Sequence, residues 1–199
     1  MPSLLRSSTL NILIVFTAVI YSSATPVAGP FRVIPDHFEK CPVELRPKTE
    51  TIKLFYHGVR DRKDPDLWFY NFNGTTHFTL DDNIMAIGNI ASWSTRGGWK
   101  DNAYVMKLPR ICSTFKRCAP DLWERFMVVT FNDPKAFCPF PPGFYSFNNM
   151  STNFNFKMPP SFYYGKWRAT IQLVNSSNAV HFCMRAYGST APKLKRKPE

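Results

Sequence analysis

The sequence lacks the short motifs of the common catalytic and cofactor sites. It has no H-E-x-x-H or C-x-x-C spacing for a metal, no G-x-S-x-G turn for a serine nucleophile, and no P-loop or G-x-G-x-x-G loop for phosphate. Four histidines are present, and we interpret each as a structural or surface residue: His37, His57, His77 and His181. These absences favour a protein that is not an enzyme and that holds no metal or other cofactor. A hydrolase whose catalytic residues are dispersed along the chain is an alternative.

Long apolar runs are absent after the first 21 residues. The run that begins at Leu10 follows the basic Arg6, is too short for a comfortable transmembrane helix, and is followed by small residues. This pattern is typical of a secretory signal peptide, with cleavage expected after Ala24. We therefore expect a secreted, extracellular protein in three parts: a signal peptide (residues 1–24), a single domain (residues 25–190) and a basic disordered tail (residues 191–199).

Acidic residues are scarce. The chain of 199 residues has 14 Asp and Glu against 25 Lys and Arg, which gives a net charge of +11. Such a balance favours anionic partners, such as lipid head groups or glycans, and simple solubility explains it equally well. Because we expect export, we expect no nucleic-acid partner.

Cysteines are few and odd in number: Cys41, Cys112, Cys118, Cys138 and Cys183. Export would place them in an oxidising compartment, where disulfides form. The residues alone do not decide which two pairs form and which thiol stays free.

Three N-x-S/T sequons support the same route through the secretory pathway. Their asparagines are Asn73, Asn149 and Asn175. Each lies in a polar stretch that we interpret as a turn, where an acceptor of an N-linked glycan is expected.

Little in the sequence favours a helical bundle. Its 17 prolines and 18 phenylalanines indicate many short strands joined by proline-rich turns, the first of them within GPFRVIPDHFEKC. Ile52, Leu54 and Tyr56 alternate with their neighbours as in a strand. The dipeptide Asn73-Gly74 predicts a tight hairpin between LWFYNF and THFTL.

The clearest hairpin lies near the C-terminus. Every second residue from Trp167 to Leu173 is apolar, NSSN forms a turn, and every second residue from Val180 to Ala186 is again apolar. Cys183 falls on the opposite face, so its disulfide should hold an edge or outer surface rather than fill the core.

One segment departs from the β pattern. PRICSTFKRCAPDLWERFMVV has apolar residues at roughly helical spacing, and Pro120 suits the first turn of a second helix. We therefore predict a mainly β fold with one or two short helices inserted around residues 110–128.

Aromatic residues are abundant. Trp93 and Trp99 flank the pair Gly97-Gly98, and FCPFPPGFYSF and NFNFKMPPSFYYGKW carry many more. Large apolar residues in proline-rich loops either fold back over a core or line the mouth of a cavity. The residues alone leave both readings open.

Several of these segments together resemble a known family. GPFRVIPDHFEKC, ASWSTRGGWKDNAYVM, CPFPPGFY and YYGKWRATIQLV…HFCMRA occur in the order found in secreted arthropod proteins that are similar to the ganglioside activator. That activator belongs to the lipid-recognition (ML-type) superfamily, and the resemblance covers most of the chain between Gly29 and Ala186. It implies an antiparallel β-cup or β-sandwich.

The resemblance also implies a disulfide pattern. It pairs Cys41 with Cys183 and Cys112 with Cys138, and leaves Cys118 as the free thiol. A tight bridge between Cys112 and Cys118 remains an alternative.

The resemblance implies binding without catalysis. Such a protein holds a lipid or another small apolar ligand in a hydrophobic cup, as a carrier or presenter, and some relatives are chemosensory. We expect the mouth and lining of the cup to include Trp93, Trp99, Phe140, Phe144, Tyr145, Phe156, Phe162, Tyr164 and Trp167. Arg96 and Lys100 would suit an anionic head group and transient contact with an anionic membrane surface. The alternative is a secreted interaction protein of the salivary or venom type, with a solid core and no ligand cavity.

Overall fold

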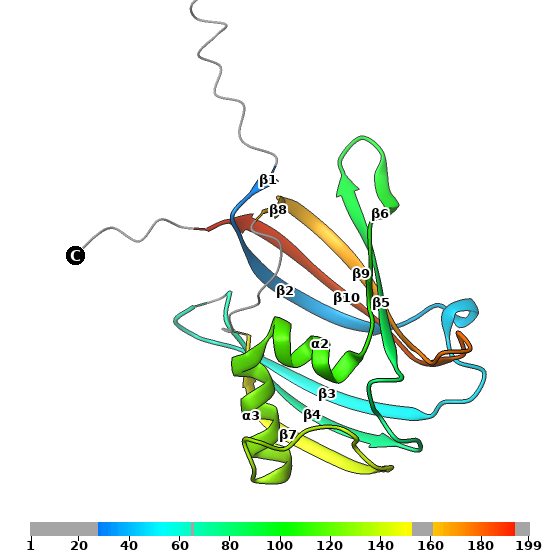
Figure 1. Cartoon of the computed structure of the whole chain (residues 1–199). Helices are drawn as coiled ribbons and strands as arrows, with labels where there is room; N and C mark the ends of the chain where they lie inside the picture. Colours follow the sequence, from blue (N-terminus) through cyan, green and yellow to red (C-terminus); the bar gives the residue numbers. More distant parts are fainter. Residues whose placement is uncertain (1–27, 65, 153–160, 194–199) are drawn as a thin grey trace, which may run out of the picture.

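The computed structural model describes residues 28–64, 66–152 and 161–193 (Figure 1). The fold is mainly β, with antiparallel sheets and two short helices, as predicted. The strands are β1 (Ala28–Gly29), β2 (Phe31–Lys40), β3 (Ile52–Arg60), β4 (Trp68–Thr76), β5 (Met85–Ser94), β6 (Gly98–Leu108), β7 (Gly143–Ser151), β8 (Phe162–Tyr163), β9 (Gly165–Val174) and β10 (Val180–Pro192). The helices are the single 3-10 turn η1 (Val43–Leu45), α2 (Ile111–Cys118) and α3 (Pro120–Phe131).

The predicted signal peptide and most of the predicted tail lie outside the described residues. Strand β10 runs to Pro192, so the ordered domain extends slightly past the boundary that we expected at residue 190. No helix in the described part of the chain is long and apolar enough to cross a membrane.

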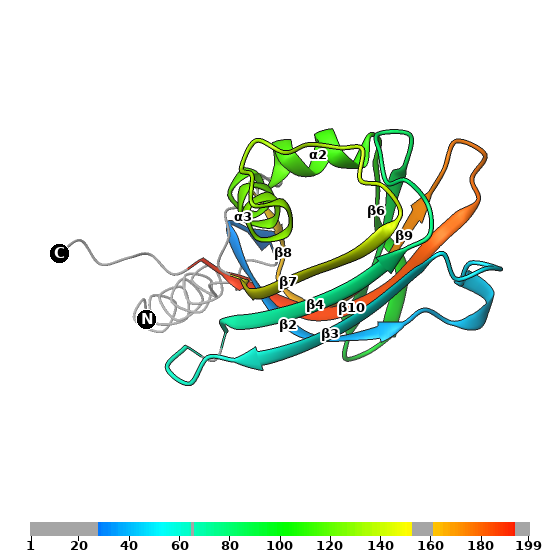
Figure 2. The same ribbon diagram turned by 90° about the horizontal axis from the view of Figure 1, so that it is seen from below.

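Two larger sheets face each other (Figures 1 and 2). The five-stranded sheet has the order β2-β10-β9-β5-β6, the three-stranded sheet has the order β3-β4-β7, and β1 pairs with β8 at one end. Every pairing is antiparallel. The edge strands β2 and β3 lie on the same side of this arrangement, and we call the line along which they meet the seam.

Ring contacts identify the inner faces of the two sheets. Phe38 of β2 lies 5.2 Å from Tyr56 of β3 and 5.3 Å from Tyr70 of β4, measured between ring centroids. The Tyr56 hydroxyl also donates a hydrogen bond of 2.8 Å to the Phe38 carbonyl, which ties the seam together. Phe38 is paired with Ala186, and Ala186 with Ala169, so all three share the inner face.

The C-terminal hairpin predicted from the sequence is confirmed as β9 and β10. Ile171 is paired with Met184 and Trp167 with Gly188, so the apolar face of the hairpin is the inner one. Gly188 is required where it lies, because an added Cβ would approach the ring of Trp167 to 2.6 Å and the carbonyl oxygen of Ile34 to 2.7 Å.

The hairpin predicted at Asn73-Gly74 is wrong. Strand β4 runs straight through this dipeptide, and Gly74 is paired with Leu54 on one side and Tyr145 on the other. Because β4 is the central strand of its sheet, pairing on both sides satisfies its backbone and outweighs the local preference for a turn. The turn between β3 and β4 lies earlier, where the Asp61 carboxylate accepts the backbone N–H groups of Lys63 and Asp64.

Two short helices occur where we predicted them, with Pro120 in the first turn of α3. α3 ends at Phe131, three residues beyond the predicted limit. The helices lie on the β7 side of the fold, opposite β3 (Figure 2). The ring of Phe126 contacts Phe147 on the inner face of β7 at 5.0 Å, so α3 closes the side of the interior that is remote from the seam.

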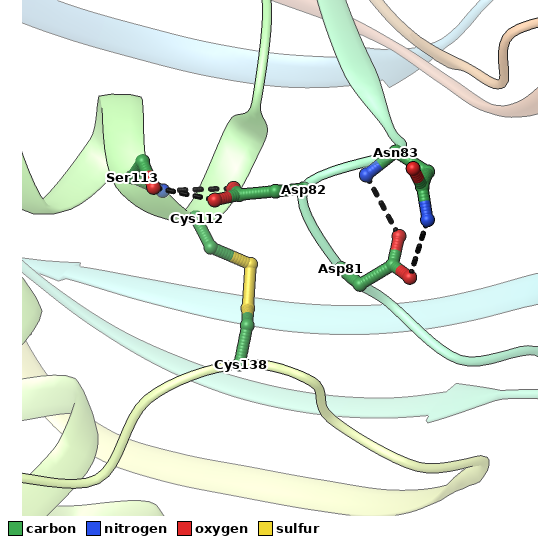
Figure 3. Close-up of a disulfide and its surroundings, with 6 residues drawn as sticks. All are labelled: Asp81, Asp82, Asn83, Cys112, Ser113 and Cys138. Atoms are coloured by element: carbon green, nitrogen blue, oxygen red, sulfur yellow. Dashed lines mark hydrogen bonds between the residues drawn. A yellow bond between two sulfur atoms is a disulfide. The ribbon is translucent and has the colours of Figure 1, made fainter.

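The N-terminus of α2 is capped from outside the helix (Figure 3). Arg110, at the N-cap position, has a left-handed backbone and makes no side-chain cap. Instead the Asp82 carboxylate accepts hydrogen bonds from the Ser113 backbone N–H, at 2.9 Å, and from the Ser113 hydroxyl. The net effect of this environment is to lower the pKa of Asp82 below its ordinary value of 3.8. Partial burial alone would raise the pKa, but the bonds from Ser113, the Cys112 N–H and the charge of Arg110 together outweigh it.

Replacing Asp82 with alanine should lower the free energy of unfolding by about 1 kcal/mol, because N–H groups of α2 lose their acceptor. Since the folded pKa is depressed, this contribution is complete above pH values of about 5 and disappears as the pH falls through the folded pKa. Urea denaturation at several pH values measures both effects. Asp81→Ala is the matched control, because the Asp81 side chain bonds to Asn83 within its own turn rather than to α2. A cost that persisted unchanged at pH values near 2 would contradict this role.

The disulfides join Cys41 to Cys183 and Cys112 to Cys138 (Figure 3), and Cys118 is free. The pattern implied by the resemblance is therefore confirmed, and the alternative bridge from Cys112 to Cys118 is wrong.

The expectation that the Cys183 disulfide lies at the surface is only partly met. Cys183 is paired with Gln172 on the outer face of the five-stranded sheet, as the alternation predicts. Cys41, however, is fully buried, because the η1 segment folds across this face. The Gln172 side chain donates to the Leu45 carbonyl, and the Arg46 Nε donates to the Cys41 carbonyl at 2.5 Å. The loop therefore covers the bridge.

Candidate ligand site between the sheets

The inner face of the five-stranded sheet is not packed as a closed core over its whole length. Inward residues of central strands in a solid sandwich are normally buried completely. Here most of the apolar inward residues of β9 and β10 are partly exposed: Trp167, Ala169, Ile171, Leu173, Phe182 and Met184. The buried cluster that also contains Cys112 lies instead beneath the helices, around Trp123, Met127 and Phe140.

A pocket of about 310 Å³ opens at the seam, and we call it the seam pocket. Its apolar floor is formed by Ile52, Leu54, Tyr56, Phe182 and Met184. Its rim carries the charged residues Glu39, Lys40, Arg46, Lys48 and Glu50. Its volume is at the lower end of the range of small-molecule sites, which starts at about 300 Å³.

The register of β3 places the floor residues. Leu54 is paired with Gly74 and Tyr56 with Phe72, on the inner face of the three-stranded sheet. Gly74 leaves room for Leu54, whose Cδ1 lies 3.4 Å from the position that a Cβ of Gly74 would occupy. The alternation predicted for β3 is therefore the feature that presents an apolar surface at the seam.

The rim is held by the disulfide and the η1 loop. The hydrogen bond from Arg46 to the Cys41 carbonyl fixes the start of the loop beside β2. Burial, and the nearby negative charge of Glu39, raise the pKa of Tyr56, so its phenol stays protonated and continues to bond β2. An apolar floor with a charged rim, on which bases outnumber acids by three to two, suits an amphiphile whose polar end stays at the mouth.

Polar groups without partners also lie on the inner faces. The indole N–H groups of Trp68 and Trp167 and the hydroxyl of Tyr70 are buried, and none has a hydrogen-bond partner in the described parts of the chain. Burial is the main cause that raises the pKa of Tyr70, which therefore remains a donor at neutral pH. Such donors could bond an acceptor on a molecule that enters the interior.

Two of the predicted site residues lie at the interior. Trp167 is on the inner face of β9, and Phe162 of β8 contacts Phe31 at 5.5 Å and Tyr104 at 6.0 Å, near the end where β1 and β8 pair. Tyr164 donates from its hydroxyl to the Pro30 carbonyl and has a role in packing this end. None of the three lines the seam pocket.

The other predicted residues do not join this site. Phe140 is buried in the cluster beneath the helices, and Tyr145 packs against the same cluster. Phe144 lies on the outer face of the three-stranded sheet and is 67% exposed. Phe156 lies outside the described residues.

Trp93 and Trp99 lie on the outer face of the five-stranded sheet. Their rings are 5.3 Å apart, and the ring of Trp99 is 6.0 Å from Tyr187 and 4.9 Å from the guanidinium of Arg168. Arg168 and Tyr187 are paired on the face opposite Trp167. We expected these two tryptophans at the mouth or in the lining of the cup; they do not line the interior, because the alternation along β5 and β6 turns them away from it.

The floor residues of the seam pocket were not in the predicted site. The sequence shows the alternation of β3 and of β10 separately, but nothing local shows that the two strands approach each other. The bridge between Cys41 and Cys183 supplies a signal, since it joins the end of β2 to the part of β10 that carries Phe182 and Met184.

A second groove, of about 420 Å³, lies between α3 and the end of β7. This groove is separate from the interior between the sheets. Polar and apolar residues both line it: Asp121, Glu124, Arg125, Val128, Val129, Asn148, Asn149 and Met150. Across residues 28–64, 66–152 and 161–193, no three His, Cys, Asp or Glu side chains gather in a way that could hold a metal ion.

No protein-family model matches the chain, and no curated protein matches its sequence. The geometry defines the class: a disulfide-bonded protein of two larger antiparallel sheets and one small one, with short helices on one side and an apolar pocket at the opposite seam.

Proposed function

We propose that this protein is a secreted, non-catalytic carrier or presenter of a lipid or another small apolar ligand. The ligand lies between the two sheets and enters through the seam pocket, with its polar end at the charged rim. The observation that carries the proposal is the partly exposed apolar face of β9 and β10 beside a pocket with an apolar floor.

The energetics are adequate for a chain-like ligand. Burial of each methylene contributes about 0.8 kcal/mol, so a long acyl chain supplies on the order of 10 kcal/mol before the costs of association. An apolar floor can therefore bind tightly with few polar contacts. The buried donors Trp68, Tyr70 and Trp167 favour a ligand that also carries an acceptor group.

Membership of the lipid-recognition superfamily, with a chemosensory role as in some relatives, is part of this proposal. It is supported by the order of the sequence segments, by the confirmed cysteine pairing and by the two-sheet fold. Two disulfides are compatible with an extracellular protein. We also propose N-glycosylation at Asn73, Asn149 and Asn175.

Transient contact with an anionic membrane is supported by the tip of the β5–β6 hairpin. Trp93 is 43% exposed there, and Arg96 and Lys100 are exposed close to it in sequence. An indole beside basic residues suits the boundary between lipid and water.

Leu54→Glu tests the site. A carboxylate on the pocket floor should weaken ligand binding by at least about tenfold, the equivalent of about 1.4 kcal/mol, because the ligand would have to desolvate it. The measurement is the amount of lipid retained after incubation of the disulfide-intact protein with a lipid mixture and gel filtration.

Phe55→Glu is the matched control. It introduces the same charge at the next residue of the same strand, on the opposite face of the sheet. The proposal predicts that this variant retains lipid like the unmodified protein. Equal lipid retention by both variants would show that the ligand does not bind at the seam pocket.

A further inference from the structure

The outer face of the three-stranded sheet exposes large apolar side chains. Phe55 is 71% exposed, Phe144 is 67% exposed and Val59 is 53% exposed. Phe55 and Val59 lie on β3 and Phe144 on β7, so they flank the central strand β4 from both sides. Large apolar side chains that gather on one exposed face mark a candidate contact surface.

One sequon lies in the middle of this surface. Asn73 is paired directly with Phe55 on one side and Ser146 on the other. Thr75, the third residue of the sequon, is paired with Phe144. The prediction that Asn73 lies in a turn is wrong, and its actual position on β4 places it among the exposed phenylalanines.

The side chain of Asn73 is oriented so that its amide nitrogen, the atom to which a glycan is attached, stays accessible. The Ser146 hydroxyl donates a hydrogen bond of 2.7 Å to Asn73 Oδ1, and Asn73 is exposed. Nothing in the described parts of the chain accepts a hydrogen bond from its Nδ2. Nδ2 is the atom that becomes glycosylated.

We infer that Asn73 carries an N-linked oligosaccharide whose first sugars lie across Phe55 and Phe144 and shield the outer face of the three-stranded sheet. The inference rests on the proposed secretion. Transfer forms a bond between Asn73 Nδ2 and the anomeric carbon of an oligosaccharide, and breaks the bond between that carbon and the diphosphate of a polyprenyl carrier. Nδ2 loses one proton, and the polyprenyl diphosphate leaves. The C–H face of a sugar ring then packs on the aromatic ring.

The sequon at Asn175 provides a contrast within the same chain. Asn175 Oδ1 accepts the N–H groups of Ser177 and Ala179 in the turn between β9 and β10. Its neighbours from Ser176 to Ala179 are exposed but small. A glycan there has no large apolar surface to cover.

The experiment compares Thr75→Ala with Ser177→Ala, each of which removes the hydroxyl of one sequon and keeps its asparagine. The full chain is secreted from eukaryotic cells, and glycopeptide mass spectrometry measures occupancy. We expect Asn73 to be occupied in the unmodified protein. Thr75→Ala should then bind more of an apolar fluorescent dye and unfold about 2–4 °C lower, whereas Ser177→Ala should change neither.

Two further variants separate the effect of the glycan from the effect of the substitution itself. Thr75→Ser retains the sequon and should behave like the unmodified protein. Adding Phe55→Ser to Thr75→Ala should remove the excess dye binding. An unoccupied Asn73 beside an occupied Asn175, or equal dye binding by Thr75→Ala and Ser177→Ala, overturns the inference alone. No glycan at any sequon overturns the proposed glycosylation as a whole, failure of the chain to reach the medium overturns the proposed secretion, and lipid retention reports separately on the ligand site.

Discussion

Replacing Cys41 and Cys183 together with alanine should lower the free energy of unfolding by about 5 kcal/mol. The bridge closes a loop of 142 residues, and the loss of that constraint enlarges the conformational freedom of the unfolded chain. The midpoint of thermal unfolding should fall by about 10–20 °C, since 1 kcal/mol corresponds to about 2–4 °C for a chain of this size. Denaturation of the purified variant measures both quantities.

The second bridge provides the comparison. It separates Cys112 and Cys138 by 26 residues, so its removal should cost less, about 3.5 kcal/mol. Both pairs are compared in a Cys118→Ala background, which prevents exchange with the free thiol. A smaller cost for the Cys41–Cys183 pair than for the Cys112–Cys138 pair would contradict the loop-closure account.

Trp123→Ala should destabilise the protein by about 3–5 kcal/mol, the usual cost of truncating a buried tryptophan. Trp123 is 3% exposed and its ring lies 5.7 Å from Phe115, 5.5 Å from Phe137 and 6.0 Å from Phe140. This cluster attaches the helices to the rest of the fold, and its loss leaves a cavity. Chemical denaturation measures the change.

Trp123→Phe is the matched variant, and it should cost clearly less. The indole N–H of Trp123 is buried without a partner in the described segments, so its removal discards no hydrogen bond and keeps most of the ring packing. Equal costs for the two variants would contradict this account of the cluster, because a phenyl ring in the same place would then recover none of the lost packing. Lipid retention by Trp123→Phe should be unchanged, because the cluster is remote from the seam pocket.

Local patterns in the sequence predict the elements well where one strong signal dominates. The alternation around Trp167 and Val180 predicts the β9–β10 hairpin, and Pro120 predicts the break between α2 and α3. Asn73-Gly74 carries an equally strong local signal for a turn, yet it lies in a central strand. Pairing with two neighbouring strands decides this position, and that pairing is not visible in a segment of a few residues.

The candidate site was less accessible to prediction than the fold. We predicted Trp93, Phe140 and Phe144 for the ligand site because aromatic residues are abundant around them. The abundance of aromatics does not decide which face of a strand a residue occupies. A shift of one residue in register exchanges the inner and outer faces. The floor of the seam pocket combines Leu54 and Met184 from strands that are far apart in the chain, and only the packing of the two sheets brings them together.

We propose above that the space between the sheets holds a small apolar ligand. Native mass spectrometry with lipid extraction tests it most directly, on protein secreted from eukaryotic cells with both disulfides intact. We expect a bound mass in the lipid range that is lost on denaturation and then identified in the extract. A protein mass without added ligand, unchanged after exposure to a lipid mixture, would contradict the account and favour a solid-core interaction protein.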